Sequence, residues 1–325
     1  MRALVTGAHG FIGSHLTERL LEEGWAVRAL VSPWGKLDNL GAVSERPRLE
    51  VVRANLTQRE TLEEVCEGVE VIFHAAAKVA DWGAWKGFYQ TNVLGTEFLL
   101  REAERSNVKR FVLVSSIAVH PYTGFRDADT RTLPRDGSVN AYAQSKILAE
   151  DAVMGADLET VIVRPGLMPF GPRDPNFLRV VQEVKRGTLP LVDGGTSVFN
   201  TAYAENLTQG LFLAGTVPVA AGRTYLIADE RTPSWRELFA ELANLLNAPK
   251  PRLNLPGSVV EPLADAVERL YAKVAPKTEP PLTRYRARLM RQDVHFSIQD
   301  AKRELGYEPR VAWQRGLAKT LQELG

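Results

Sequence analysis

The most constraining feature of this 325-residue sequence is a glycine-rich turn between an apolar run and an amphipathic stretch, close to its first residue. The run Ala3–Val5 is typical of a short buried strand, and it is followed by Thr6-Gly7-Ala8-His9-Gly10-Phe11-Ile12-Gly13. Gly7 permits a tight turn out of the strand, Gly10 lets a ligand approach the backbone, and Gly13 lets the following helix pack closely. The sequence therefore predicts a strand–turn–helix unit of a parallel sheet.

The first half of the chain continues this alternation of short apolar runs with helical stretches. The apolar runs are rich in Val, as expected for parallel strands covered by helices on both faces. We expect strands at Ala3–Val5, Ala26–Val31, Leu49–Arg53, Val69–His74, Phe111–Ser115 and Thr160–Val163. Helices are expected at Phe11–Glu23, Gln58–Val65, Trp85–Arg105 and Ala141–Met154. The predicted fold class is α/β, with a doubly wound parallel sheet.

The composition of the sequence changes after Arg164-Pro165, where prolines and glycines become frequent. The remaining chain reads as helices joined by Pro-rich turns such as Pro249-Lys250-Pro251. We therefore predict a sheet domain over residues 1–170 and a smaller, mostly helical substrate-binding lobe over residues 171–325. The lobe is expected over the carboxyl edge of the sheet, where open α/β folds bind their ligands. A segment of about 196–230 is expected to return to the sheet domain.

The glycine turn suits a dinucleotide. A helix that begins directly after such a turn presents free N–H groups and a partial positive charge to a pyrophosphate. A strand before the turn and a helix after it are the context that the dinucleotide-binding (Rossmann) motif requires. We expect cofactor contacts from the loop residues Gly7, His9, Gly10, Phe11, Ile12 and Gly13.

The choice between NAD and NADP depends on the end of the second strand. An acidic residue there would bind the ribose 2′-hydroxyl of NAD, but the strand ends in Val31-Ser32 without a carboxylate. Ser32 can hydrogen-bond a 2′-phosphate, and Lys36 lies within loop reach to neutralise it. We therefore favour NADP(H) over NAD(H), which stays the alternative.

Tyr142 and Lys146 form the candidate catalytic pair. Tyr142-Ala143-Gln144-Ser145-Lys146 lies near the start of an expected helix, with Ser138 or Asn140 as its cap. A spacing of four places the phenol and the ammonium on one helical face. A free tyrosine titrates near pH 10, and we expect the lysine and the helix N-terminus to favour its phenolate. Such a tyrosine can exchange a proton with an alcohol or ketone oxygen.

Ser116 adds a hydroxyl at the carboxyl end of the fifth expected strand, where this fold places its active sites. It can hydrogen-bond a substrate oxygen and stabilise charge that develops there. Ser115 is one residue earlier and should point away, because side chains alternate along a strand. A serine that only caps the turn after the strand is the alternative.

These residues carry a family resemblance. TGAHGFIG, HAAAKVADWG, TNVLGT, VLVSSIAVH, YAQSK and RPGLMPFGP occur in the order found in extended short-chain dehydrogenases/reductases, which belong to the NAD-dependent epimerase/dehydratase superfamily. The likeness covers Thr6 to Pro172 and continues more weakly to ELGYEP at Glu304–Pro309.

The resemblance implies roles for particular residues. Ser116, Tyr142 and Lys146 match the catalytic residues of that family, and the lysine there also binds the nicotinamide ribose. It further implies that Asn92 braces the active site and that the chain forms a homodimer through the helices around Gly95–Arg105 and Ala141–Met154. The cofactor-contacting residues that it implies are Asn55, Leu56, Ala75, Ala76, Ala77, Pro165, Gly166 and Leu167.

The substrate is expected to be a largely apolar small molecule. Sugar-nucleotide enzymes of this family commonly carry a cationic segment for the diphosphate, whereas the matching stretch Ser197–Tyr203 is uncharged here. Arg173, Arg179 or Arg284 could substitute for it. HAAAKVADWG resembles the branch of 3β-hydroxysteroid dehydrogenase-like enzymes and β-keto acid reductases. The residues that we place in the substrate site are Lys78, Trp82, Trp85, His120 and Phe177.

We therefore predict an NAD(P)-dependent enzyme that interconverts a secondary alcohol and a ketone. One alternative is a nucleotide-sugar epimerase or dehydratase that uses the same three residues with tightly held NAD. A second is a non-catalytic, NAD(P)-sensing binding protein, although relatives of that kind usually lack the tyrosine or the lysine, and both are present here.

Composition excludes several other classes. The net charge is +1, which gives no electrostatic reason to expect nucleic acid or an anionic membrane as a partner. Cys66 is the only cysteine, so the fold needs no disulfide, and the five histidines lack metal-ligand spacing. No signal peptide or membrane span is evident; residues 257–275 are apolar at helical spacing but interrupted by charges, which indicates a surface-packed helix. We expect a cytoplasmic enzyme without a metal.

Overall fold

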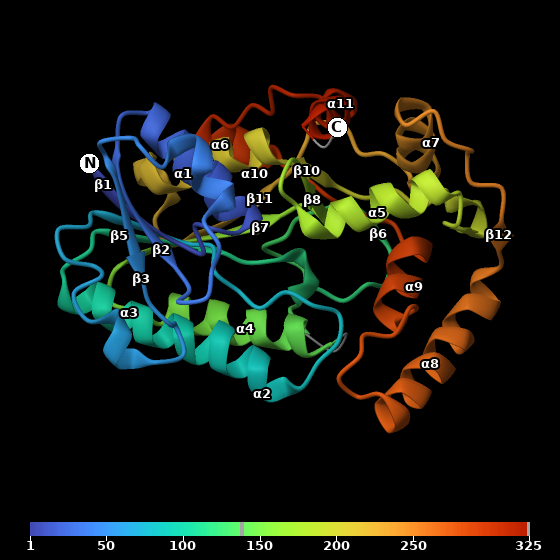
Figure 1. Ribbon diagram of the computed structural model, residues 1–325, viewed down its shortest axis with the longest axis horizontal. Helices are drawn as coiled ribbons and strands as arrows, with labels where there is room; N and C mark the ends of the chain where they lie inside the picture. Colours follow the sequence, from blue (N-terminus) through green and yellow to red (C-terminus); the bar gives the residue numbers. More distant parts are fainter. Residues whose placement is uncertain (137–139, 324–325) are drawn as a thin grey trace.

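A computed structural model describes residues 1–136 and 140–323. Within them, seven parallel strands form one sheet in the order β11–β7–β5–β4–β1–β2–β3 (Figure 1). The strands are β1 (Arg2–Thr6), β2 (Ala26–Val31), β3 (Leu49–Arg53), β4 (Val71–His74), β5 (Arg110–Val114), β7 (Glu159–Pro165) and β11 (Arg223–Ile227). The predicted doubly wound α/β class is confirmed.

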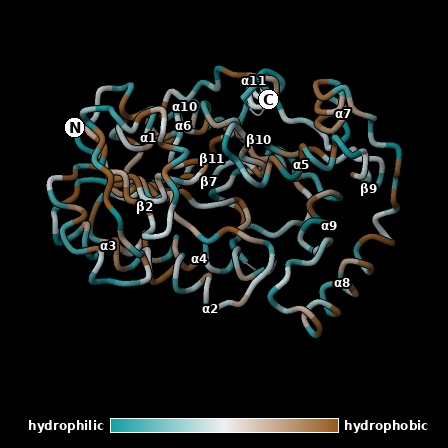
Figure 2. Tube along the Cα trace, in the orientation of Figure 1, coloured by the Kyte–Doolittle hydropathy of each residue, from teal (hydrophilic) through white to brown (hydrophobic). Residues whose placement is uncertain are grey.

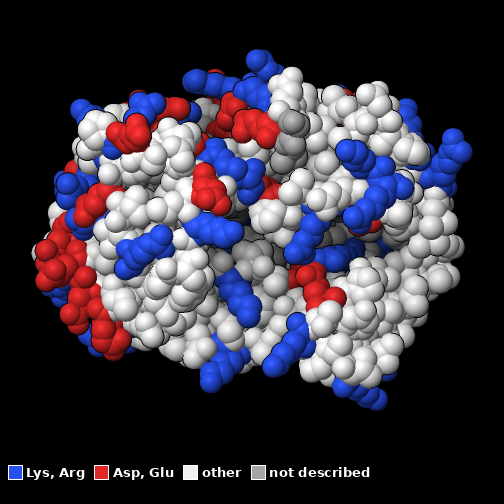
Figure 3. All heavy atoms as spheres, viewed as in Figure 1, with Lys and Arg blue, Asp and Glu red and all other residues white. Residues whose placement is uncertain are grey.

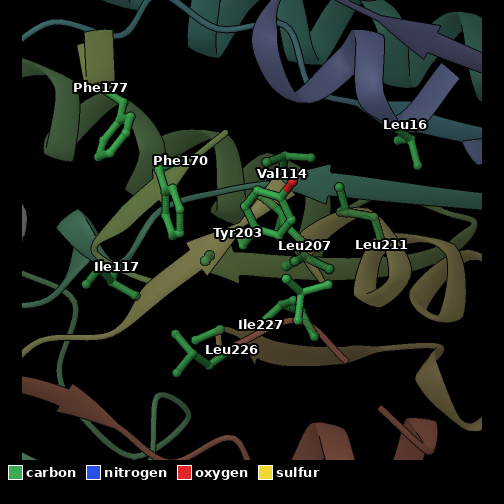
Figure 4. Packing of buried hydrophobic residues seen from close by; sticks show 14 of the residues in the cluster. Leu16, Val114, Ile117, Phe170, Phe177, Tyr203, Leu207, Leu211, Leu226 and Ile227 are labelled. Carbon is green, nitrogen blue, oxygen red and sulfur yellow. The ribbon is translucent and has the colours of Figure 1, made fainter. Parts of the chain in front are cut away.

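Helices cover both faces of this sheet (Figure 1). One face carries α1 (Phe11–Glu22) and α6 (Ala204–Thr216), and the other carries α3 (Gly95–Arg105) and α4 (Ala141–Met154). The central strands are largely apolar (Figure 2) because each must bury side chains on both faces. Figure 4 shows this packing, with Leu207 and Leu211 of α6 beside Ile227 of β11.

Two of the expected helices differ from the observed elements. Residues 58–65 form only a 3₁₀ turn at Arg59–Leu62, because Glu64 takes a left-handed conformation with φ of 66° and stops any helix there. The expected helix Trp85–Arg105 is present as α2 (Trp85–Phe88), a π-helical turn at Tyr89–Leu94, and α3. Such π-turns frequently occur at functional sites.

The C-terminal half forms most of a second, largely helical layer beyond the carboxyl edge of the sheet (Figure 1). Its helices are α5 (Pro175–Arg186), α7 (Trp235–Leu245), α8 (Gly257–Val274), α9 (Arg284–Arg291) and α11 (Trp313–Gln322). Helix α10 (Gln299–Leu305) packs instead against α6 and β11 of the sheet domain. Three short parallel pairs join the second layer together: β8 (Met168–Phe170) with β10 (Thr201–Tyr203), β9 (Leu191–Val192) with β12 (Asn254–Leu255), and β6 (Phe125–Ala128) with β13 (Val294–Phe296). Within residues 201–227, β10, α6 and β11 lead the chain back to the central sheet.

Helix α8 packs through Val260 and Ala264, whereas Leu263 and Leu270 on its outer side are exposed. Across the described part of the chain, none of the helices combines the length and apolarity needed to span a bilayer. Basic and acidic side chains share the face shown in Figure 3, and the acidic ones gather toward its left edge.

Candidate active site

The glycine turn after β1 is shaped by close backbone contacts. Gly7 has a φ of +65°, and a Cβ there would lie 2.8 Å from the Ala76 Cα. A Cβ on Gly13 would lie 2.2 Å from the Gly7 carbonyl oxygen, so this glycine lets the helix approach its own turn rather than the sheet. Helix α1 begins after Gly10 without a side-chain cap, which leaves N–H groups at its N-terminus for a ligand. This cradle fits the pyrophosphate of a dinucleotide.

The loop after β2 lies against the glycine turn. Ser32 Oγ is 3.5 Å from Nε2 of His9, and Asn39 Nδ2 donates to the His9 carbonyl at 2.9 Å. Burial lowers the pKa of His9, and the positive charge of Arg53 lowers it further. Phe11 and Ile12 are half-buried at the start of α1, and Lys36 is exposed.

Arg53 was not identified from the sequence. Its guanidinium donates to the carbonyl oxygens of Ser32, Pro33 and Gly35 at 3.0–3.1 Å and so holds the loop that carries Ser32 and Lys36. Arg53 pairs with Val31 in the register of β2 and β3, so its position at the end of the neighbouring strand is the signal that could have indicated it.

The residues expected around the adenine and along the cofactor follow β3 and β4. Asn55 accepts hydrogen bonds from the backbone and the hydroxyl of Thr57, and Leu56 is buried against Gly95. Ala75, Ala76 and Ala77 directly follow β4 and are half-buried. The Ala76 N–H donates to Thr6 Oγ1 at 3.1 Å, which ties this segment to the glycine turn.

Tyr142 and Lys146 occupy the first two turns of α4, which begins at a capped end. The Asn140 side chain accepts from the Ala143 N–H at 2.9 Å, and Ser138, the other expected cap, lies outside the described residues. Lys146 is 3% exposed, and its Nζ donates to the Val114 carbonyl oxygen at the end of β5 at 2.7 Å. The helix thus places the ammonium next to the end of β5, two residues before Ser116.

The pKa of Tyr142 is shifted in the opposite direction to the one expected from the sequence. Burial raises the pKa of Tyr142 to about 12, whereas the sequence predicted that Lys146 would lower it. The nearby Ser116 hydroxyl favours the phenolate, but the charge of Asp81 acts against it. Burial also lowers the pKa of Lys146 to about 8, although Glu150 raises it. Desolvation therefore dominates at both groups, and Tyr142 is protonated at neutral pH.

Ser116 both caps a turn and neighbours the tyrosine. Its Oγ accepts from the Ala118 N–H at 3.1 Å, which starts the 3₁₀ turn Ile117–Val119. The hydroxyl keeps its proton for another acceptor, because the cap uses only a lone pair. Ser115 points away from it, donating to Glu150 Oε1 at 2.5 Å inside the core.

Asn92 lies in the π-helical turn and joins two parts of the site. Its Oδ1 accepts from the Lys78 N–H at 2.7 Å, and its Nδ2 donates to the Lys78 carbonyl at 3.0 Å and to Ser145 Oγ at 2.9 Å. Asn92 is 2% exposed. The geometry fits a bracing role between the loop after β4 and helix α4.

A buried ion pair behind Lys146 was not identified from the sequence. Glu150 is fully buried and accepts two hydrogen bonds from Arg164, at 2.8 and 2.6 Å, besides one from Ser115 and one from Arg135 at 3.2 Å. Burial alone would raise the pKa of Glu150, but Arg164 brings it below its usual value. Tyr142, Lys146 and Glu150 are spaced by four along α4, which is the pattern that could have indicated this third member.

A hydrogen-bond chain through His74 was also missed. Thr6 Oγ1 lies 2.7 Å from His74 Nδ1, and His74 Nε2 lies 3.0 Å from Thr96 Oγ1, which donates to the Asn92 carbonyl. Burial, and after it the charge of Lys146, lowers the pKa of His74 to about 3, so the ring is neutral. The chain ties the glycine turn to the segment of Asn92.

Three of the five residues expected in the substrate site lie on one segment of the chain. Trp82 donates from Nε1 to the Pro276 carbonyl at 2.9 Å, Trp85 is 38% exposed, and the Lys78 ammonium lies 4.8 Å from the centre of the Phe88 ring. These three lie on the loop after β4 and at the start of α2.

His120 and Phe177, the other two residues expected in the substrate site, are both buried. His120 is fully buried and lies between Thr130 and Arg164, whose atoms approach its Nε2 to 2.9 and 3.0 Å. Phe177 is 2% exposed and packs on Phe170 with ring centres 5.2 Å apart (Figure 4). Both side chains are held by these contacts, and a role in substrate binding stays a prediction for each.

Pro165 and Gly166 are buried at the end of β7, and Leu167 beside them is half-buried. A Cβ on Gly166 would lie 3.0 Å from the Asn200 carbonyl oxygen, so the chain passes very close to the segment before β10. The resemblance places these residues beside the nicotinamide, and that role stays a prediction.

Two of the three arginines considered for a diphosphate are engaged elsewhere. Arg173 forms a two-point pair with Glu18 at 2.8 and 2.7 Å, and Arg284 pairs with Glu268 at 2.6 Å. Arg179 is less constrained, 3.7 Å from Glu279. In residues 1–136 and 140–323, no group of three or more His, Cys, Asp or Glu side chains is arranged to hold a metal ion.

The whole chain is similar to known oxidoreductases. The sequence model of the NAD dependent epimerase/dehydratase family matches residues 3–228. A 2-alkyl-3-oxoalkanoate reductase of Stenotrophomonas maltophilia is 30% identical over 98% of both chains. A 3 beta-hydroxysteroid dehydrogenase/Delta 5-->4-isomerase of Mycobacterium tuberculosis is 30% identical over 98% of this chain and 89% of its own. A dTDP-glucose 4,6-dehydratase structure from Streptomyces venezuelae, with NAD bound, superimposes with a TM-score of 0.79 at 26% identity, covering 99% of this chain and 96% of its own.

The fold and the site define a nicotinamide-dependent oxidoreductase of the extended short-chain dehydrogenase/reductase type. The chain belongs to the NAD dependent epimerase/dehydratase family. Within it, the chain falls in the 3β-hydroxysteroid dehydrogenase-like branch and is an enzyme that interconverts an alcohol and a ketone.

Proposed function

We propose that the enzyme reduces a ketone on a largely apolar substrate, and oxidises the corresponding secondary alcohol, with Ser116, Tyr142 and Lys146 as its catalytic residues. The observation that carries this proposal is the arrangement at the end of β5. There the Val114 carbonyl accepts a hydrogen bond from the Lys146 ammonium. Ser116 follows two residues after the end of the strand, and its hydroxyl interacts with Tyr142.

The glycine turn at Gly7–Gly13 would hold the pyrophosphate of a dinucleotide, and the nicotinamide of that cofactor would supply the hydride needed to reduce a carbonyl carbon. Tyr142 donates its proton to the carbonyl oxygen, so the ketone gains a hydride and a proton and becomes the alcohol. Ser116 donates a hydrogen bond to the same oxygen and stabilises its developing charge. Lys146 stabilises the phenolate that remains, and Asn92 acts as a positioning residue by holding Lys78 and Ser145.

The protonated state of Tyr142 supports reduction as the favoured direction at neutral pH. A phenol with a pKa of about 12 already carries the proton that a ketone needs. Oxidation of an alcohol needs the phenolate instead, so its rate should rise with pH.

An apolar substrate is supported by the side chains near the tyrosine and by the relatives. Trp82 on the loop after β4 and Tyr122 after β5 present aromatic surface near this edge of the sheet. The relatives named above act on a 2-alkyl-3-oxoalkanoate and a 3β-hydroxysteroid according to their names. A β-keto acid or a hydroxysteroid is therefore the class of substrate that we propose.

We further propose NADP(H) as the preferred cofactor. Ser32 and the exposed Lys36 lie on the loop held by Arg53, and β2 ends without a carboxylate that would repel a 2′-phosphate. The proposed cofactor contacts are those expected from the sequence, with Arg53 added as the residue that positions the loop.

An epimerase or dehydratase remains the alternative function. Arg179, which is exposed and only loosely paired, is the observation that favours it, because a sugar diphosphate needs a free cation. A non-catalytic sensor is disfavoured, because Tyr142 and Lys146 are both present and neighbour Ser116.

One assay separates these functions. The purified enzyme is mixed with NADPH or NADH and with a panel of medium-chain ketones, 3-oxo esters, ketosteroids and sugar nucleotides, and the absorbance of the reduced cofactor is followed. Net oxidation with a ketone is the expected result. Conversion of a sugar nucleotide without net oxidation would show an epimerase, and tight cofactor binding with no conversion would show a sensor.

We also propose a cytoplasmic homodimer formed through α3 and α4. The half-buried Phe98 and the 53% exposed Met154 lie on these helices and would gain cover at such a contact. Cys66 is buried, and the fold needs no disulfide, which suits a reducing compartment. Sedimentation of the wild type against a Met154→Glu variant tests the dimer, and a monomeric wild type would contradict it.

A further inference from the structure

Three tyrosines from distant parts of the chain meet at the catalytic edge of the sheet. Tyr142 lies in the first turn of α4, Tyr122 follows Ser116 by six residues, and Tyr285 is the second residue of α9. The Tyr122 and Tyr285 hydroxyl oxygens are 3.4 Å apart, and their rings lie edge to face with centres 5.5 Å apart. Both phenols interact electrostatically with Tyr142.

The pair of hydroxyls keeps one unused donor. Tyr122 is 7% exposed and Tyr285 is half-buried, and across residues 1–136 and 140–323 their shared contact is the only hydrogen bond that either hydroxyl makes. One hydroxyl donates to the other, so the accepting hydroxyl still has a hydrogen to give. A buried phenol normally finds an acceptor, and none of the described protein groups supplies one here.

Two contacts fix Tyr285 in this place. The Arg286 guanidinium, one residue further along α9, pairs with Asp81 at 2.7 Å and also with Glu279. Beside it, Trp82 donates to the Pro276 carbonyl at 2.9 Å. The loop after β4 thus holds the start of α9 over the carboxyl edge of the sheet. The hydroxyl pair is therefore a preorganised feature rather than a chance contact of two mobile side chains.

The two phenols remain neutral donors. Burial raises the pKa of Tyr122 and of Tyr285, and the carboxylate of Asp81 raises both further. A neutral donor beside the catalytic phenol suits a neutral or anionic oxygen acceptor on the ligand.

We propose that Tyr122 and Tyr285 form a subsite that binds a second oxygen atom of the substrate, next to the carbonyl oxygen held by Tyr142 and Ser116. The substrate class is then a ketone with a second oxygen function a short carbon spacer away, as in a 3-oxo acid or its ester. A compound with one isolated carbonyl leaves the spare phenol hydrogen without an acceptor. This subsite rests on the proposed ketone reduction and specifies its substrate.

A matched pair of ketones tests the subsite. Ethyl 3-oxohexanoate and nonan-4-one have the same chain shape, but only the ester carries oxygen beyond the reacting carbonyl. The ratio of their kcat/KM values is measured for the wild type and for Tyr122→Phe and Tyr285→Phe. Effects that a substitution has on both ketones alike cancel in this ratio. The greater intrinsic reactivity of the ester cancels when the ratio of a variant is divided by that of the wild type.

Each substitution is expected to lower the ratio by about tenfold, as for the loss of one net hydrogen bond. The double variant should lower it no further than the more affected single variant, because the two hydroxyls act as a unit. Tyr225→Phe is the matched control, since its hydroxyl binds Glu304 at 2.9 Å away from this site, and it should keep the wild-type ratio.

An unchanged ratio in both single variants overturns the subsite while leaving ketone reduction intact. If the wild type oxidises reduced cofactor with neither ketone, the subsite fails, and inertness toward ketosteroids as well would also overturn the proposed reduction. Circular dichroism and cofactor affinity confirm that each variant is folded. If one single variant fails to fold, the other still tests the subsite.

Discussion

The buried ammonium of Lys146 gives a prediction for the pH dependence of reduction. Burial lowers the pKa of Lys146 from 10.5 to about 8, and its side chain is 3% exposed and bonded to the Val114 carbonyl. The difference between the two pKa values corresponds to about 3 kcal/mol of disfavoured charge. The lysine therefore loses its proton within the range in which the enzyme can be assayed.

The ammonium is needed because it stabilises the phenolate left when Tyr142 gives up its proton. We expect kcat/KM for a ketone to be flat from pH 6.5 to near 8 and then to fall about tenfold per pH unit. The assay follows reduced-cofactor absorbance over this range in buffers of constant ionic strength. Lys146→Met is the comparison variant, which should be slow at every pH and should show no decline centred near 8.

Two results would refute this reasoning. One is a wild-type profile that stays flat to pH 10, and the other is a Lys146→Met profile with the same decline as the wild type. The sign of the stability effect gives a second check. The folded pKa is below the unfolded one, so the cost of burying the charge is fully present below pH 8 and disappears as the pH rises toward 10.5. The wild type should therefore gain stability relative to Lys146→Met between pH 8 and 10.5.

Three further predictions concern the ion pair, the glycine turn and the cofactor. Arg164→Leu should destabilise the fold by about 3 kcal/mol in urea unfolding, because the buried Glu150 loses its two-point partner and keeps only the single ionic contact with Arg135. The control Arg186→Leu, from an exposed pair, should cost less than about 1 kcal/mol, and equal losses would contradict the argument. Gly7→Ala should abolish measurable cofactor binding by fluorescence titration, since a Cβ meets Ala76 at 2.8 Å and φ is +65°, and an unchanged Kd would count against the cradle. Lys36→Ala should raise the KM for NADPH about tenfold and leave that for NADH unchanged, and equal effects on both would remove the 2′-phosphate assignment.

Much of the sheet could be predicted because its strands are short apolar runs buried on both faces. β2, β3 and α4 have the bounds expected from the sequence, and Asn140 provides a recognisable start for α4. The helix expected at 58–65 is absent because Glu64 adopts a left-handed conformation, which its residue type does not indicate. The strand pairs of the second layer have two to four residues each, too few for any periodicity to show.

The candidate site was predictable in its residue types but not in its electrostatics. Spacing along one helix brings Tyr142 and Lys146 together, but the acceptor of the ammonium is the Val114 carbonyl on another element. Burial, which a sequence does not display, raises the pKa of Tyr142 instead of lowering it. For the same reason His120 was expected to face a substrate but lies in the core, and Tyr122 and Tyr285, 163 residues apart, were not connected.

The central claim is that the Tyr142 hydroxyl delivers the proton to the carbonyl oxygen. The most direct test is the turnover of Tyr142→Phe with a ketone that the wild type reduces, measured together with its Kd for the reduced cofactor. We predict that kcat falls by about 10²- to 10⁴-fold while the Kd stays within about twofold of the wild type. Turnover of Tyr142→Phe at the wild-type rate would contradict the account.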